Sequence, residues 1–275
     1  MFLVTVTNEK YVLNAINLIE SYKFNSFNDR ILFFALQLSD SSKKFLKNRY
    51  GEQIYIEDVP LVCDHAHDLR TFFYKVYTIK RAMEFENDFI YSDATNEIVK
   101  FTIELKKDLI TTGGHLFFSY NHEMLKNKYW TTNQCFEKMD CLGEEFREAQ
   151  QHWAGLQIYE SSSKNKQFVD KMYDYALDIG VIGPDTTVKR PDGSEGICKE
   201  HRQDQSIFSL LIQKFGFLQP YNLEITQKYG DQQTMLDFDK GYKFDMNKVT
   251  ILSRSSKFGS YNFLSKNIIK EYEQK

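Results

Sequence analysis

Apolar runs and amphipathic segments alternate along the first part of the chain. The β-prone run from Phe2 to Thr7 predicts a buried strand. In the next segment, Tyr11 to Tyr22, apolar residues recur at helical spacing, which predicts a helix that buries one face. The later elements predicted in this half are a strand at Ile31–Leu36, a helix capped near Ser39 and ending at Tyr50, a strand at Gln53–Glu57, a helix at Thr71–Phe85 and a strand at Phe89–Tyr91.

This order predicts an α/β fold, in which a mainly parallel sheet is covered by helices on both faces. Ligands of such sheets bind beyond the carboxyl ends of the strands. Two of those ends carry polar residues: Thr7-Asn8 after the first strand and Ser92-Asp93 after the fourth. We therefore expect a binding site there.

The second half has a less regular pattern. It predicts strands at Leu116–Tyr120 and Gly155–Tyr159, a helix at Lys166–Leu177 that ends at Gly180, and a helix at Gln205–Phe215. Between these helices, Pro184 to Glu200 holds two prolines and two glycines. This composition is typical of a surface loop, which is a candidate for a flexible lid.

Length and charge restrict the class of protein. A chain of 275 residues and 32.5 kDa suits one large domain or two small ones. Its 42% hydrophobic and 27% charged residues exclude wholesale disorder. The formal net charge of -3 argues against a nucleic-acid partner, although the tail from Lys240 to Lys275 is locally basic.

No membrane or export segment is expected. The longest apolar run, Ile31–Leu36, is far shorter than the ~20 residues of a transmembrane helix, and the N-terminus has the pattern of a strand rather than of a signal peptide. The cysteines form no C-x-x-C and no zinc pattern; they are Cys63, Cys135, Cys141 and Cys198. We expect reduced thiols in a cytoplasmic protein.

Two carboxylates are candidates for chemistry. Asp93 directly follows a buried strand, where a carboxylate holds a divalent cation and through it a diphosphate, or else forms a turn or a helix cap. Asp204 lies in His201-Arg202-Gln203-Asp204-Gln205, at the start of a helix. It either caps that helix or takes a proton and faces a cationic centre, while Gln205 binds sugar hydroxyls.

Two further segments are candidates for donor contacts. The first is Gln151-His152-Trp153-Ala154-Gly155. Either its small residues Ala154 and Gly155 let a ligand approach the backbone, or Trp153 anchors the core beside a strand. Lys75 follows three aromatic residues on a predicted helix; it contacts a phosphate or a sugar hydroxyl, or is simply solvated. His65 and His67 have i, i+2 spacing without a partner pair, which favours a solvated loop over a metal site.

In this order the motifs resemble those of nucleotide-diphospho-sugar glycosyltransferases of the GT-A fold, closest to the family 8 type and to related transferases of viruses and bacterial polysaccharide clusters. Phe73-Tyr74-Lys75 is similar to their "yyR" helix, with Lys for Arg. Asp93-Ala94-Thr95 is similar to the metal motif D-x-D, and Gln151 to Gly155 to a Q-x-x-(A/G)-G segment. The most specific similarity, to H-R-x-D-Q-S-I-F-S-L-L, covers His201 to Leu211.

The resemblance implies one GT-A-like domain over residues 1–275, with a nucleotide-binding half at 1–110 and an acceptor and catalytic half at 111–275 that ends in the basic tail. It implies transfer of a sugar from a nucleotide diphosphate sugar, such as a UDP-sugar, to a glycan, glycoprotein or other hydroxyl acceptor. Its expected nucleotide contacts are Thr7, Asn8 and Tyr11; its expected donor contacts are Lys75, Asp93, Gln151 and His152; its expected catalytic residues are Asp204 and Gln205. The resemblance covers roughly residues 1–220. Lys257, beyond it, either contacts a phosphate, because small residues flank it, or belongs to a solvated tail.

Two departures from the family pattern concern the implied Mn²⁺ or Mg²⁺. Thr95 replaces the second Asp of D-x-D, and no His follows His201, whereas many relatives supply a late His to the metal. Either Asp93 holds the metal with the diphosphate and water, or Lys75, Arg254 or Lys257 neutralises the leaving group.

Alternatives of other classes remain open at this point. A non-catalytic carbohydrate- or nucleotide-sugar-binding protein would also carry a degenerate D-x-D motif. A sugar-nucleotide hydrolase or a nucleotidyltransferase could use a similar sheet. Nucleotidyltransferases usually have a Gly-rich basic loop after the first strand, and Thr7-Asn8-Glu9-Lys10 contains no Gly.

Overall fold

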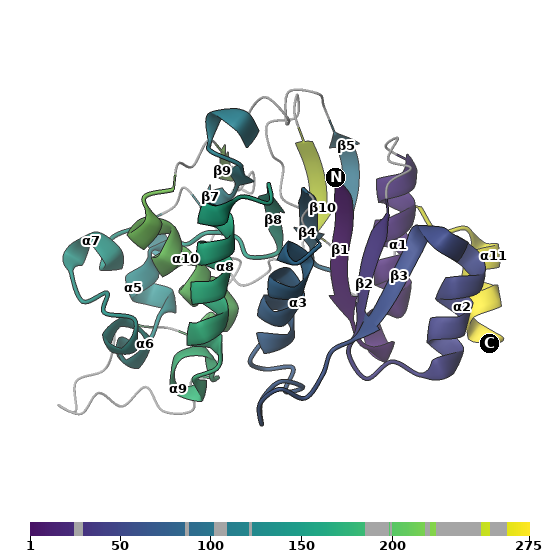
Figure 1. The fold of residues 1–275 in the computed structure, drawn as a ribbon, viewed down its shortest axis with the longest axis horizontal. Helices are drawn as coiled ribbons and strands as arrows, with labels where there is room; N and C mark the ends of the chain where they lie inside the picture. The colour runs from purple at the N-terminus through teal and green to yellow at the C-terminus, as the bar shows by residue number, and fades with distance from the viewer. Residues whose placement is uncertain are drawn as a thin grey trace.

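A computed structural model of the chain describes residues 1–24, 30–85, 88–101, 109–120, 123–184, 198, 200–217, 221–223, 249–253 and 263–275 (Figure 1). Its central sheet has the strand order β3-β2-β1-β4-β8-β6. These strands are β1 (Phe2–Thr7), β2 (Ile31–Ala35), β3 (Ile54–Asp58), β4 (Phe89–Ser92), β6 (His115–Leu116) and β8 (Leu156–Tyr159). β3, β2, β1 and β4 are parallel, and β8 is antiparallel to both of its neighbours. The prediction of a mainly parallel sheet is confirmed.

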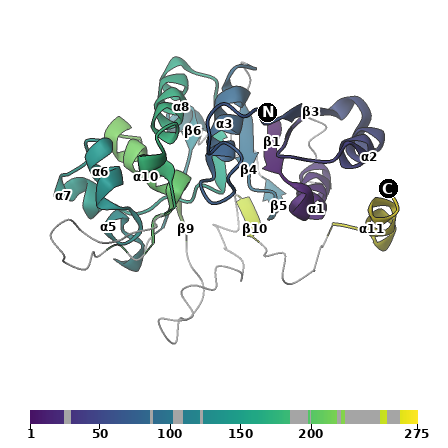
Figure 2. The same ribbon diagram turned by 90° about the horizontal axis from the view of Figure 1, so that it is seen from below.

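Helices cover both faces of the sheet, as predicted. One buried cluster joins alternate residues of β1, such as Val4, to α3 (Phe73–Met83), α8 (Ser163–Ala176) and α10 (Gln203–Phe215). The other joins the intervening residues, such as Leu3, to α1 (Val12–Phe24), α2 (Asp40–Tyr50) and α11 (Lys266–Glu273). Figure 2 shows α1 and α3 on opposite sides of β1. The fold is therefore a three-layer α/β/α arrangement.

Smaller elements surround this frame. β5 (Asn96–Phe101) pairs antiparallel with β10 (Val249–Ser253), and β7 (Phe118–Tyr120) pairs parallel with β9 (Tyr221–Leu223). The short helices are α5 (Asn127–Trp130), α6 (Asn133–Lys138), α7 (Glu144–Arg147) and α9 (Ile179–Ile182), and the 3₁₀ turns are Glu9–Tyr11, Gly51–Gln53 and Glu123–Leu125.

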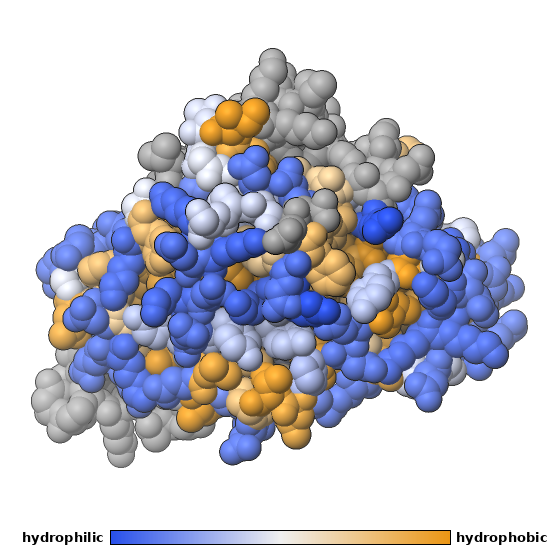
Figure 3. All heavy atoms as spheres, in the orientation of Figure 1, coloured by the Kyte–Doolittle hydropathy of each residue, from blue (hydrophilic) through white to orange (hydrophobic). Residues whose placement is uncertain are grey.

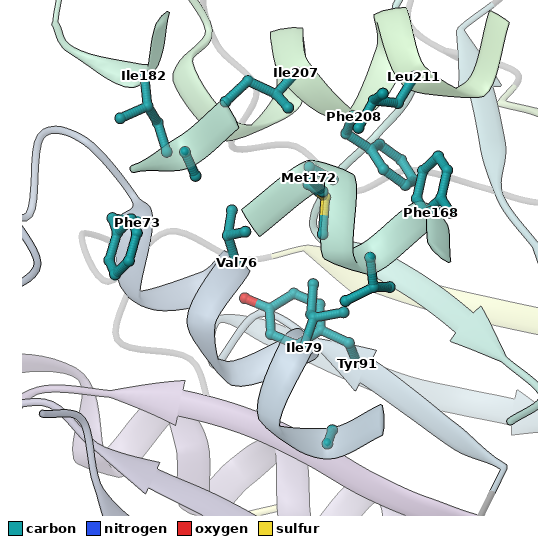
Figure 4. Close-up of a cluster of buried hydrophobic side chains, with 14 of the residues drawn as sticks. Phe73, Val76, Ile79, Tyr91, Phe168, Met172, Ile182, Ile207, Phe208 and Leu211 are labelled. Carbon is teal, nitrogen blue, oxygen red and sulfur yellow. The ribbon is translucent and has the colours of Figure 1, made fainter. Parts of the chain in front are cut away.

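The packing of α3 fixes the position of one candidate residue, Lys75. Its inward side chains, Phe73, Val76 and Ile79, are almost fully buried. In Figure 4 Val76 lies toward Met172 of α8, and Phe73 lies below Ile182 of α9; these residues share one buried cluster with Tyr91 of β4. Truncating one large buried side chain of this kind costs about 2–5 kcal/mol of stability. The packing of α3 therefore fixes its position against β4.

The first half of the chain follows its local signals closely. The Ser39 side chain accepts a hydrogen bond from Ser42 N and caps α2, and Gly51, with φ 56°, ends it. The predicted helix at 71–85 is shorter than expected at both ends, spanning Phe73–Met83. Phe72 has φ 56° and lies outside the right-handed helical region, so the helix cannot begin before Phe73.

Two predictions in the second half are wrong in detail. The strand predicted at 116–120 is divided between β6 and β7, which belong to two different sheets. The helix predicted to end at Gly180 ends at Ala176, and Gly180 instead lies inside α9. The Asp178 side chain accepts a hydrogen bond from Gly180 N and so starts this second helix.

The surface is mostly hydrophilic in the view of Figure 3, with apolar groups at its lower centre over α9 and the loop after β3. Those segments include the exposed side chains of Leu61, Val62 and Ile179. Among the helices of the described residues, none has the length and apolar character required to cross a membrane.

Candidate active site

The carboxyl ends of β1 and β4 lie side by side at one edge of the sheet. The strands are parallel neighbours, with Val4 opposite Tyr91, and Thr5 Oγ1 donates a hydrogen bond of 2.8 Å to Ser92 O. β2 lies on one side of β1 and β4 on the other, so the strand order reverses here. Parallel α/β sheets bind ligands at such a point.

Lys75 of α3 forms an ion pair with Asp93 at this edge. Lys75 Nζ lies 2.9 Å from Asp93 Oδ1 and 3.0 Å from Oδ2, and the Lys75 side chain is only 14% exposed. The ring of Phe72 lies 4.7 Å from the ammonium, within cation–π range. The alternative of a solvated helix lysine is therefore wrong.

Asp204, near the start of α10, is the third charged group. Its Oδ2 lies 4.0 Å from Lys75 Nζ, and its side chain is 10% exposed. Burial raises the pKa of the Asp204 carboxyl to about 6; the Lys75 ammonium lowers this pKa and the Asp93 carboxylate raises it. Lys75, Asp93 and Asp204 are called the charged cluster below.

Asp204 is not the N-cap of α10. The N-cap position is Arg202, whose side chain makes no capping hydrogen bond, and Gln203 is the first helical residue. The cap alternative is therefore wrong, although backbone N–H groups of the first turn still lower the pKa of the Asp204 carboxyl. The positive end of the helix thus favours a negative charge on Asp204.

Both helices that supply the cluster begin beside a residue of positive φ. Phe72, directly before α3, has φ 56°, and Gln203, the first residue of α10, has φ 35°. Such a conformation costs a non-glycine residue about 1–3 kcal/mol, and residues of this kind concentrate at functional sites. The strain supports a functional role for this edge of the sheet.

Asp93 is held in place by its strand and by the neighbouring segment. Tyr91 Oη donates a hydrogen bond of 2.9 Å to Asp93 Oδ1, and Asp93 N donates one of 2.9 Å to Gly155 O. A Cβ at Gly155 would lie 2.9 Å from Asp93 Oδ2 and 2.6 Å from Trp153 Nε1. The small residue at 155 thus makes room for the Asp93 carboxylate and the indole.

The protonation of the ion pair follows from its surroundings. Burial by itself lowers the pKa of Lys75, but the carboxylates of Asp93 and Asp204 outweigh it and hold that pKa above its ordinary value. Burial, together with the charge of Asp93, raises the pKa of Tyr91 well above its ordinary value. Lys75 therefore stays an ammonium, and Tyr91 stays a hydrogen-bond donor.

The side-chain amides of Gln205, which follows Asp204, and of Gln151 belong to one chain of hydrogen bonds. Gln205 Nε2 donates a hydrogen bond of 2.7 Å to Gln151 Oε1. Gln151 is fully buried, and its Nε2 donates to Asn127 Oδ1 at 2.9 Å and to Thr131 Oγ1 at 3.3 Å. Gln151 thus orients Gln205, while a contact of Gln151 with a donor sugar stays a prediction.

His152 lies deeper, against the aromatic core. Its ring is 6.4 Å from that of Phe208, its backbone N–H donates to Ser209 Oγ at 2.9 Å, and Ser209 Oγ donates to Gln205 O. Burial lowers the pKa of His152 to about 3, so its imidazole is neutral. A direct donor contact of His152 stays a prediction.

The candidate nucleotide contacts lie around the end of β1. Thr7 is buried, and Asn8 Oδ1 is buried without a hydrogen-bond partner among the described residues. Tyr74 lies close enough to both Tyr11 and Asp93 for their charges to act on its pKa, which burial raises. The end of β1 and Asp93 thus lie on neighbouring strands, while nucleotide contacts of Thr7, Asn8 and Tyr11 stay predictions.

The remaining predicted residues either lie outside the described residues or contact other parts of the chain. Lys257, Arg254 and most of the loop at 184–200 lie outside the described residues. His65 Nε2 lies 2.9 Å from Ala176 O and His67 Nε2 lies 2.8 Å from Val59 O. These two half-buried histidines connect a loop to its surroundings, and the preference for a loop over a metal site is consistent with these contacts.

The charged cluster does not fit the divalent metal implied by the D-x-D resemblance. Both oxygens of the Asp93 carboxylate already contact the Lys75 ammonium, and Oδ1 also accepts from Tyr91. Thr95 stands where the second acidic ligand would be. Within the described ranges, no group of three or more His, Cys, Asp or Glu could hold a metal ion.

Three supporting residues were not predicted: Tyr91, Tyr74 and Asn127. Tyr91 could have been found, because it lies at the end of β4, two residues before Asp93, and alternate residues of extended backbone face the same side. Tyr74 precedes Lys75 within the recognised motif. Asn127 carries no signal, because only the tertiary fold brings it to Gln151.

No protein-family model matches this sequence, and no curated protein matches it either. Solved structures do match. The galactosyltransferase LgtC, in complex with donor and acceptor sugar analogs, has a TM-score of 0.52 and 10% identity, over 100% of this chain and 96% of that one. An active-site variant of LgtC, in which glutamate replaces a glutamine, has a TM-score of 0.50 and 10% identity, over 100% and 94%.

A third match is the bifunctional glycosyltransferase WbbM, with a TM-score of 0.41 and 10% identity. It covers 66% of this chain, and this chain spans only 37% of WbbM; so weak a similarity supports no inference. The LgtC structures match along the whole chain. The chain thus has the α/β fold of this galactosyltransferase, and the GT-A-like fold expected from the sequence is confirmed.

Proposed function

We propose that the protein is a glycosyltransferase, which transfers a sugar from a nucleotide diphosphate donor, a UDP-sugar in the first instance, to a hydroxyl of a glycan or glycoprotein acceptor. The observation that carries this proposal is the charged cluster. α3 and α10, each of which has a residue of positive φ at its start, bring Lys75 and Asp204 to Asp93. The cluster lies at the point of the sheet where the strand order reverses. The fold shared with a galactosyltransferase supports the same reaction class.

The nucleotide would bind at the end of β1. Asn8 Oδ1 is a buried acceptor without a partner among the described residues, and leaving such an atom unsatisfied costs about 1–3 kcal/mol. An N–H or O–H donor of a base or ribose would satisfy it. Thr7 and Tyr11 flank this position and complete the proposed cradle.

The sugar would lie against the start of α10. An oxocarbenium-like transition state carries positive charge, which a nearby carboxylate stabilises, and Asp204 is the buried carboxylate on that side. The side-chain Nε2 of Gln205 donates to Gln151, so the side-chain oxygen Oε1 of Gln205 is left to accept a hydrogen bond from a sugar hydroxyl. By analogy with the active-site glutamine of LgtC, Gln205 is our candidate for that position.

The stereochemistry decides the role of Asp204. In an inverting reaction, Asp204 would take the proton of the acceptor hydroxyl as general base. In a retaining reaction, Asp204 and Gln205 would stabilise the cationic sugar. The four cysteines form no C-x-x-C pair, and we place the reaction in the cytoplasm, where thiols stay reduced.

A panel of sugar nucleotides tests the proposal. The purified protein is incubated with each donor and a mixture of glycan acceptors, and free nucleoside diphosphate and glycosylated product are measured. We expect transfer from at least one donor, and loss of transfer in Asp204→Asn but not in Asp174→Asn, an exposed aspartate on α8. Binding without turnover would favour the non-catalytic alternative, and nucleotide release without product would favour a hydrolase.

A further inference from the structure

The departing nucleoside diphosphate needs a cation beside it, because its leaving-group charge must be offset in the transition state. The implied divalent metal does not fit the described residues, as shown above. This inference therefore rests on the proposed function and asks which group of this chain supplies the positive charge.

Lys75 occupies the position at which a cation would meet Asp93. Its ammonium contacts both oxygens of the Asp93 carboxylate, at 2.9 and 3.0 Å. Metal–oxygen bonds to Mg²⁺ or Ca²⁺ are about 2.0–2.6 Å long, so a metal bound to Asp93 would lie next to this ammonium. Two cations at that separation repel each other strongly in a partly buried site.

The ammonium still has capacity for a ligand. An ammonium has three N–H donors, and its hydrogen-bonding partner among the described residues is Asp93. Asp204 Oδ2, at 4.0 Å, is beyond hydrogen-bond distance. With two of its N–H groups directed to the Asp93 oxygens, the ammonium keeps one N–H that is able to meet a phosphate oxygen.

The ammonium is held in place by groups of its own chain. Its position is set by the packing of α3, by the Phe72 ring at 4.7 Å and by Asp93, which Tyr91 and Gly155 hold in turn. A charge fixed in this way stabilises a developing anion without a reorganisation cost at the moment of reaction.

We propose that Lys75 takes the place of the divalent metal, so that this protein binds the diphosphate and transfers the sugar without a metal ion. In the reaction, the bond between the anomeric carbon and the diphosphate oxygen breaks, and its electron pair goes to that oxygen beside Lys75. The acceptor hydroxyl oxygen forms the new bond to the carbon. Its proton passes to Asp204 if configuration inverts, or to the departing diphosphate if configuration is retained.

Binding of UDP and GDP, measured by titration calorimetry, tests this role independently of turnover. The full-length protein is titrated in EDTA and again with Mn²⁺. We expect one of the two nucleotides to bind in EDTA, with an affinity that Mn²⁺ changes by less than about twofold. Lys75→Ala should weaken that binding roughly 10- to 100-fold in EDTA, as the loss of a charge-assisted hydrogen bond does.

A metal should partly rescue the alanine variant. Both carboxylates lie within 4.0 Å of the ammonium, so without it Asp93 and Asp204 should become a site for Mn²⁺ and nucleotide binding by Lys75→Ala should become Mn²⁺-dependent. Lys75→Arg keeps the charge and serves as a second variant if the alanine variant unfolds; it should bind nucleotide in EDTA. Lys80→Ala, on the exposed part of the same helix, is the matched control and should bind like the wild type.

The outcomes separate the inference from the proposed function. Wild-type binding that requires Mn²⁺, or Lys75→Ala binding as tightly as wild type in EDTA, overturns the inference and leaves the proposed function standing. No binding of either nucleotide under both conditions overturns the inference and the assignment of a UDP donor, while the donor panel above still decides on glycosyl transfer.

Discussion

The Asp93 carboxylate and the backbone of Gly155 are in such close contact that residue 155 cannot carry a side chain without moving one of its neighbours. A Cβ there would lie 2.9 Å from Asp93 Oδ2 and 2.6 Å from Trp153 Nε1, and Gly155 O accepts hydrogen bonds from Asp93 N and Asn96 Nδ2. The segment before β8 thus sets the position of the acidic residue after β4.

Gly155→Ala should displace the Asp93 carboxylate. Overpacking of this kind costs about 1–3 kcal/mol of stability, and a shift of about 1 Å in a reacting group lowers turnover by up to about 100-fold. Thermal unfolding and transfer rates of the variant measure both effects. Gly180→Ala is the matched control, because its Cβ would meet only the ends of the Gln134 and Lys138 side chains; equal activity in the two variants would contradict the positioning role.

Asp204→Asn separates a catalytic role from a structural one. The substitution preserves shape, and Asp204 is not the N-cap of its helix, so the free energy of unfolding should change by less than about 1 kcal/mol. Turnover should fall by about 10²- to 10⁴-fold, the range for loss of a general base, while nucleotide affinity is nearly kept. Turnover within a few-fold of wild type would remove Asp204 from the chemistry.

The rate of transfer should depend on pH through the same carboxyl. Burial raises the pKa of Asp204 to about 6. A carboxyl is charged above its pKa, so if its ionised form is required, the rate rises as pH increases through about 6 and levels off above it. The pH–rate profile of the wild type should show this rise, and Asp204→Asn should lack it. A flat wild-type profile from pH 5 to 8 would contradict the requirement for an ionised Asp204.

Buried His152 should make stability fall in acid. Burial lowers its pKa from 6.5 to about 3, so below pH 6.5 the unfolded chain binds a proton that the folded chain does not. This contribution to stability is present above pH 6.5 and is lost as pH falls, by up to about 1.4 kcal/mol per pH unit.

His152→Phe tests that contribution. Nδ1 has no hydrogen-bond partner among the described residues, so the substitution should cost little at neutral pH. Denaturant unfolding of both proteins between pH 7 and 5 should show a shallower loss of stability in the variant. Parallel pH dependences would mean that His152 does not contribute.

The first half of the fold could be predicted because its signals are local. The run at Phe2–Thr7, the cap at Ser39 and the stop at Gly51 act on neighbouring residues, and the structure keeps all three. The pairing of β8 antiparallel to β4 joins residues far apart in sequence, and no local pattern encodes it. The left-handed conformation of Phe72, which delays α3, also carries no local signal, because residues other than glycine rarely adopt it.

The three residues of the charged cluster were among the predicted candidates, but their arrangement could not be predicted. Asp93, Asp204 and Lys75 could be chosen from motifs, but Lys75 alone has the pattern of a solvated helix residue. Its contact with Asp93 results from the packing of α3 over β4, through side chains such as Val76. The distance between Lys75 Nζ and the Asp93 carboxylate decides whether Lys75 can take the place of a metal ion. Only the tertiary fold sets that distance.

A crystal structure with an unreactive UDP-sugar analog tests the glycosyl-transfer site most directly. We expect the base near Asn8, a diphosphate oxygen within hydrogen-bond distance of Lys75 Nζ, and the sugar between Gln205 and Asp204. A donor analog bound at another edge of the sheet, or held through a metal on Asp93 with Lys75 displaced, would contradict the site or the role of Lys75, respectively.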